Sequence, residues 1–120
     1  MGYTLSFEMP SLPKTTNAMT SMHWTQKKRM VKEIHDTIAY ITLAKRPKKP
    51  LKQAKISCER HSSVRPDYDG LVSSFKHVID ALITSQIIED DNLDVIGVPE
   101  FKWIKAKPTE GFIVVSVKEL

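Results

Sequence analysis

The chain has 120 residues, enough for one domain with a modest core. Hydrophobic residues make up 41% and charged residues 27%, which is ordinary for a globular domain. The first residues lack the pattern of a secretory signal, and no apolar run approaches the roughly 20 residues of a membrane span. With one cysteine, Cys58, no internal disulfide is possible. We therefore expect a single domain, residues 1–120, in a reducing cytoplasm with no membrane partner.

The net charge of +4 is unevenly distributed along the chain. Residues 67–94 hold one base, Lys76, and seven acids: Asp67, Asp69, Asp80, Glu89, Asp90, Asp91 and Asp94. This window carries −6, so the rest of the chain carries +10. A basic body is typical of a protein that binds a polyanion, and divalent cations reconcile an acidic cluster with phosphates. The pattern favours phosphodiester chemistry, with a chance fluctuation of surface charge as the alternative.

The first half of the chain predicts a strand and a helix. Tyr3, Leu5, Phe7 and Met9 alternate with polar residues, which indicates a half-buried strand that Pro10 ends. The polar stretch 11–16 contains a proline and is expected to be a loop. From Thr25, a plausible N-cap, to Ala44 the spacing becomes helical. The apolar stripe of this helix consists of Met30, Ile34, Ile38 and Ile41.

The second half predicts the remaining elements. Two prolines make 45–50 a loop, and alternation from Leu51 to Arg60 indicates a second strand. A second helix is expected from about Gly70 to Thr84, with Asp69 as its cap. Two further strands follow, near 94–106 and 112–117, and 107–111 is expected to be the hairpin turn that joins them. The order β-α-β-α-β-β predicts an α+β domain, a small mixed sheet packed against two helices.

Three acids stand where the strand-loop-helix segment and the turn after the helix are expected to converge. Asp67 and Asp69 precede the second helix, and Asp91 follows it. Mg²⁺ takes oxygen ligands and is commonly held by a few carboxylates plus waters and substrate phosphate. Taken singly, each acid has an ordinary structural role: a turn residue at 67, a helix cap at 69 and a solvated turn at 89–91.

The combined pattern is more specific than its parts. It consists of Asp67-Tyr68-Asp69-Gly70-Leu71, a helix with Lys76, Asp80, Ala81 and Leu82, and Ile87-Ile88 leading to Asp90-Asp91. This pattern resembles the signature of the RusA family of phage and prophage Holliday junction resolvases. The resemblance is close over about the central quarter of the chain, and the stretch from Pro10 through Asn17-Ala18 to His23-Trp24 is also similar to many phage members.

The resemblance implies a RusA-like fold and a set of roles. Asp67, Asp69 and Asp91 would be catalytic residues that bind Mg²⁺ or Mn²⁺, and Lys76 would stabilise charge on the phosphate. Asp80 would support the structure rather than bind metal. The family works as a homodimer in the bacterial cytoplasm and cuts two strands of a four-way DNA junction symmetrically. It functions in recombination and repair.

Two departures from the family pattern bear on activity. Gly70 replaces the usual Asn after the second aspartate, which removes a side-chain amide near the metal. Lys76 lies seven residues after Asp69, the longer spacing of phage members; this is close to two helical turns and keeps both on one face. Because of Gly70, a catalytically weak or inactive branched-DNA-binding protein of the same fold remains an alternative. A nucleotide phosphoesterase and a nuclease for flaps or forks are further alternatives.

Basic residues supply the expected DNA contacts. Lys27, Lys28, Arg29 and Lys32 occupy the first turns of the first helix, where the dipole disfavours positive charge by about 0.3–1 kcal/mol each. A phosphate near that end offsets this cost, and Arg65 would add a contact near the aspartates. A second basic block, 45–49, is either another contact or a solvated loop. Trp24 favours a hydrophobic staple, with base stacking beside His23 as the alternative.

Overall fold

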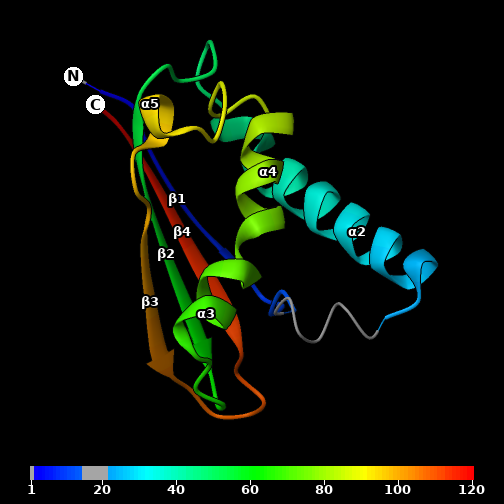
Figure 1. The fold of residues 1–120 in the computed structure, drawn as a ribbon. Coiled ribbons are helices and arrows are strands. Elements are labelled where there is room, and N and C mark those ends of the chain that lie inside the picture. Colours follow the sequence, from blue (N-terminus) through cyan, green and yellow to red (C-terminus); the bar gives the residue numbers. More distant parts are fainter. Residues whose placement is uncertain (1, 15–21) are drawn as a thin grey trace.

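The computed structural model describes residues 2–14 and 22–120. Its four strands, β1 (Thr4–Met9), β2 (Ala54–Ser62), β3 (Glu100–Lys105) and β4 (Phe112–Glu119), form one sheet in the order β1-β4-β2-β3. Strand β4 pairs antiparallel with both β1 and β2, whereas β3 pairs parallel with β2. The helices lie on one side of the sheet (Figure 1). The predicted α+β class, a small mixed sheet with helices, is confirmed.

The helices differ in number and bounds from the prediction. They are α2 (Trp24–Thr42), the 3₁₀ turn η1 (Leu43–Lys45), α3 (Tyr68–Ser74), α4 (Lys76–Thr84) and α5 (Leu93–Ile96). The simple order β-α-β-α-β-β is therefore not the one observed. The predicted hairpin at 107–111 is also wrong, because β2 lies between β3 and β4 in the sheet. The predicted second helix is divided into two, and a short helix stands where the third strand was expected to begin.

The division between α3 and α4 falls at Phe75. Its backbone dihedrals, φ −97° and ψ 0°, depart from the values of a regular α-helix, and its N–H donates to the Val72 carbonyl oxygen at 3.1 Å. The Phe75 side chain is fully buried, with its ring centroid 5.9 Å from that of Phe101 on β3. No glycine or proline marks the break in the sequence. The break is instead accompanied by the contact between Phe75 and the sheet, and local helix propensity does not encode such a tertiary contact.

Helix α5 replaces the first residues of the strand predicted from position 94. The Asn92 side chain accepts a hydrogen bond from the Val95 N–H at 3.0 Å and caps the helix. Gly97, with φ +58°, ends it in a conformation that suits glycine. The turn buries the adjacent residues Val95 and Ile96 against the core, so the beginning of the predicted strand is a helical turn.

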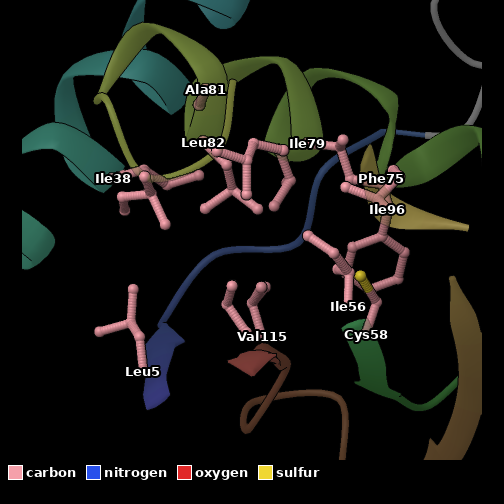
Figure 2. Packing of buried hydrophobic residues seen from close by; sticks show 14 of the residues in the cluster. Leu5, Ile38, Ile56, Cys58, Phe75, Ile79, Ala81, Leu82, Ile96 and Val115 are labelled. Atoms are coloured by element: carbon pink, nitrogen blue, oxygen red, sulfur yellow. The ribbon is translucent and has the colours of Figure 1, made fainter. Parts of the chain in front are cut away.

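The core lies between the sheet and the helices. In each strand alternate residues face it, among them Leu5 of β1, Ile56 and Cys58 of β2, and Val115 of β4. Figure 2 shows these residues opposite Ile38 of α2 and the α4 residues Ile79, Ala81 and Leu82. The predictions of the first and second strands rest on this alternation. Both strands and the predicted fourth strand are confirmed, with small shifts of their ends.

Helix α2 begins one residue earlier than expected and is capped differently. His23, not Thr25, is the N-cap, and its Nδ1 accepts from the Thr25 N–H at 3.3 Å. The apolar stripe is confirmed, because Ile34 and Ile38 are buried in the core with Met30 and Ile41 packed at its margin. Neither α2 nor any other helix in the described ranges is long and apolar enough to cross a membrane.

The Cys58 thiol provides a test of the packing. Its side chain is 1% exposed, and burial raises its pKa to about 12, so the reactive thiolate is suppressed. We expect the native protein to react at pH 8 with a thiol reagent far more slowly than the same protein in urea. The absorbance of the released chromophore measures both rates. Equal rates in the two conditions would show that β2 is not packed as described.

Candidate metal and nucleic-acid site

Asp67 and Asp69 lie at the start of α3, just after the carboxyl end of β2. Asp67 adopts an extended conformation after Pro66, and its Oδ1 accepts a hydrogen bond from the Gly70 N–H at 2.7 Å. Asp67 is therefore the N-cap, not Asp69, which lies in the first turn. Both side chains are exposed, and Asp69 makes no hydrogen bond or ion pair with the described residues. Its carboxylate is available to a ligand.

Asp91 lies in the turn between α4 and α5. Its backbone N–H donates to Asp90 Oδ1 at 2.7 Å, and Asn92 Nδ2 donates to Asp90 Oδ2 at 3.1 Å. Partial desolvation raises the pKa of Asp91, and the carboxylates of Asp90 and Asp80 add to this shift. The turn thus holds acids that repel one another, a state that a bound cation would relieve.

The two halves of the predicted metal site lie at opposite ends of β2. Leu51, before its amino end, accepts from the Glu89 N–H at 3.0 Å and donates to the Ile87 carbonyl at 2.9 Å. Asp67 follows its carboxyl end, and the nine residues of β2 span roughly 26 Å at about 3.3 Å per residue. Figure 1 shows α3 and α5 near opposite ends of the sheet.

The expectation that Asp67, Asp69 and Asp91 converge within one chain is therefore wrong. No group of three histidine, cysteine, aspartate or glutamate side chains suited to a metal ion exists in ranges 2–14 and 22–120. The physical reason is the parallel pairing of β2 with β3, since the connecting helices must carry the chain back along the sheet. The chain does reverse after the second helix, but this reversal does not bring Asp91 close to Asp67 and Asp69 at the start of that helix.

Asp80 is the acidic neighbour that sequence reasoning placed outside the site. It lies on α4, four residues after Lys76, and contributes to the raised pKa of Asp91. His77 Nδ1 is 3.9 Å from Asp80 Oδ2. The only sequence signal for this grouping is the charge density of 67–94, which does not say which acids meet.

Lys76 begins α4, and its neighbourhood is basic. The pKa of His77 is lowered by burial first and also by the charges of Lys76 and of Lys27, while Asp80 opposes the shift. These effects place the first turns of α2 and α4 within electrostatic reach of each other. Because α3 and α4 are separate helices, the argument that Lys76 and Asp69 share one continuous helical face does not hold.

The other predicted DNA contacts are exposed. Lys27, Lys28 and Arg29 point from the start of α2, whose first turn contains no acid. Lys32 forms an exposed ion pair with Asp36 at 2.6 Å, which is worth little and does not prevent a phosphate contact. The guanidinium carbon of Arg65 lies 5.9 Å from the centroid of the Trp103 ring.

The N-terminal stretch is only partly described. Asn17 and Ala18, which contribute to the family resemblance, lie outside the described residues. Trp24 is 67% exposed, so it is not a hydrophobic staple. Its ring is stacked beside the His23 ring, with the centroids 6.1 Å apart. Because the Trp24 side chain is exposed, it is accessible to a base.

Comparison of the chain with family models and with curated proteins finds no match.

Replacing the Asp67 cap separates its structural role from any other. Asp67→Ala should lower the free energy of unfolding by about 1 kcal/mol, because the Gly70 N–H loses its partner. Asp67→Asn should change it by only a few tenths of a kcal/mol, since Asn caps about as well. Urea unfolding measures both. Equal losses for the two variants would contradict the capping hydrogen bond.

Proposed function

We propose that this chain is a metal-dependent endonuclease that cuts branched DNA, a Holliday junction resolvase of the RusA type. One observation carries the proposal. Six of the seven acids in 67–94 form no ion pair with any described residue, in a chain with 18 lysines and arginines; only Asp80 has such a neighbour, His77. Exposed carboxylates left unpaired in a basic protein are suited to divalent cations beside a polyanion.

The metal site that we propose is shared between two chains. The donor set fits Mg²⁺ or Mn²⁺, because the exposed carboxylate oxygens are the ligands that these cations prefer. Asp67 and Asp69 lie at one end of β2 and Asp91 at the other. A two-fold homodimer that sets α3 of one chain against the 89–91 turn of its partner supplies all three carboxylates twice.

The remaining residues bind and orient the DNA. A bound Mg²⁺ or Mn²⁺ would polarise the scissile phosphate and lower the pKa of a coordinated water. The Lys76 ammonium is assigned to the charge that develops on the phosphate. Lys27, Lys28, Arg29, Lys32 and Arg65 are assigned to backbone phosphates, which position the substrate without reading its sequence.

The exposed setting of the aspartates favours a polymer over a small molecule. Asp67, Asp69 and Asp91 are all exposed, and none of them lines the large hollow at the amino end of β2. A nucleotide phosphoesterase would instead enclose its substrate. We place the activity in the recombination and repair of DNA in the bacterial cytoplasm, with a phage or prophage as the source.

A second candidate is a branched-DNA-binding protein of the same fold without catalysis. The observation in its favour is that one chain does not assemble three metal ligands among its described residues. Gly70 in place of Asn would also weaken support around a metal. Cutting of a junction decides between the two candidates.

The first test is cleavage of a synthetic four-way junction beside linear duplex, in Mg²⁺, in Mn²⁺ and in EDTA. We expect paired symmetric nicks that require metal and are absent with Asp67→Asn and with Asp91→Asn. Junction affinity should be equal or higher in both variants, because each removes a negative charge from a phosphate-facing surface. Tight binding without nicks under any metal would establish the inactive binding protein instead.

Mixing these two inactive variants tests the shared site. A dimer of one Asp67→Asn chain and one Asp91→Asn chain has one intact composite site, so equal mixing should restore about a quarter of the sites. The restored product should carry a nick in one strand only. If each site were confined to one chain, the mixture would stay inactive even when the subunits exchange.

Lys76→Ala provides a separate test of the proposed electrostatic role. We expect the single-turnover cleavage rate to fall by about 10²-fold or more while junction affinity changes less than threefold. Lys28→Ala, on the exposed surface of α2, is the matched control that should weaken binding at unchanged rate. An equal loss of affinity in both variants would reduce Lys76 to a phosphate contact.

A further inference from the structure

A large hollow lies at the amino end of β2, at the end of the sheet away from α3. Its volume is about 1090 Å³. Pro47, Pro50 and Val95 contribute apolar surface to its wall, while Lys48, Lys49 and Lys52 are exposed along it. A concave site of this size with apolar walls and a few charged groups is suited to a ligand that has both an apolar and an anionic part.

The loop that carries these lysines is anchored at both ends. The Tyr3 hydroxyl donates a hydrogen bond to the Lys45 carbonyl oxygen, just before the loop. Leu51, which is 4% exposed, is bonded through its backbone to the 87–89 segment. Two prolines further restrict the backbone between these anchors. Lys48 and Lys49 are therefore displayed from a fixed segment, and Lys52 directly follows its second anchor.

The lysines are also electrostatically available. Lys48, Lys49 and Lys52 form no ion pair with the described residues. Two acids, Asp94 and Glu119, also line the hollow. Glu119 is directed to the backbone, because its Oε1 accepts a hydrogen bond from the Tyr3 N–H at 2.9 Å. The three ammonium groups exceed the two carboxylates, so the hollow favours an anionic ligand.

We propose that this hollow binds an unpaired nucleotide of a DNA strand. The lysines contact the flanking phosphates, and the apolar wall of Pro47, Pro50 and Val95 packs against the base and sugar. Such a site accepts any base, because none of these groups reads a base edge. The second basic block of the sequence is then a substrate contact rather than a solvated loop.

The location of the hollow relates it to the proposed nuclease, on which this inference rests. Leu51 and Asp94 line the hollow, and Leu51 is bonded to the segment that leads directly into Asp90 and Asp91. A strand held here passes beside the acidic turn that we assign to the metal site. Unpaired nucleotides occur where duplexes branch, so the hollow would favour branched DNA over linear duplex.

The test compares two triple variants in the full chain. Each also carries Asp67→Asn, and binding is measured in EDTA, so that no cutting intervenes. The first variant replaces Lys48, Lys49 and Lys52 with Ala, and the control replaces Lys102, Lys105 and Lys107. The control removes the same charge from exposed positions at the other end of the sheet. Fluorescence anisotropy follows a labelled thymidine oligonucleotide of about 12 residues, near the length that single-strand sites cover.

We expect the first variant to bind the oligonucleotide at least tenfold more weakly and the control less than threefold. The slope of log affinity against log salt should decrease in magnitude by about 2 in the first variant, because each single-strand phosphate that a lysine no longer neutralises accounts for roughly 0.7. Replacing the same three lysines with Arg should restore most of the affinity. Equal losses in the two alanine variants would show that net charge alone is responsible and would overturn the proposal.

Two further results separate this inference from the proposed function. If the first variant loses oligonucleotide binding but the unmodified chain never cuts a junction, the hollow stands and the nuclease fails. If the chain cuts junctions and the first variant binds the oligonucleotide normally, the nuclease stands and the proposed role of the hollow fails. An acidic peptide with leucine side chains serves as a second probe. If the first variant no longer binds this peptide but still binds the oligonucleotide, the hollow is a protein-docking site and the proposal is overturned.

Discussion

The parallel pairing of β2 with β3 is the constraint on which the arrangement of the functional groups depends. Parallel neighbours need a connection that returns the chain along the full length of the sheet. Helices α3 and α4 provide that connection and cover the core on the way. Asp67 and Asp69 consequently stand where the crossover begins, and Asp91 stands near where it ends. A chain reversal by hairpin would have placed them together.

The acidic turn at 89–91 is held by apolar anchors rather than by opposite charges. Ile87 and Ile88 are buried in the core, and backbone hydrogen bonds join the segment to Leu51. Because this framework is independent of the carboxylates, the turn tolerates the desolvation and the repulsion that together raise the pKa of Asp91. The fold therefore keeps negative charge at a place where stability alone would favour a lysine nearby. Charge retained against repulsion is the usual mark of a binding or catalytic group.

Much of the fold was predictable from side-chain periodicity, since alternation located β1 and β2 and the 3.6-residue stripe located α2. The break at Phe75 was not predictable, because it accompanies a contact with Phe101 about 26 residues away. The start of α5 was signalled by Asn92 and its end by Gly97, but the sequence analysis assigned these positions to the strand predicted from 94. For the site, the sequence located the acidic window 67–94 and its candidate ligands. It did not predict their separation, because that depends on the direction in which β3 pairs.

Asp67 has a structural role as the N-cap of α3, whereas Asp69 takes no part in the cap. A cap needs one carboxylate oxygen, and Oδ1 of Asp67 supplies it to the Gly70 N–H. The partial positive charge at a helix N-terminus repels a cation, so a single carboxylate there is a poor metal ligand. A second carboxylate, Asp69, reverses the local sign, and the lone pairs that the cap leaves on Asp67 become usable. The third carboxylate must then come from outside this end of the chain, which makes a partner subunit the natural source for a site that binds metal.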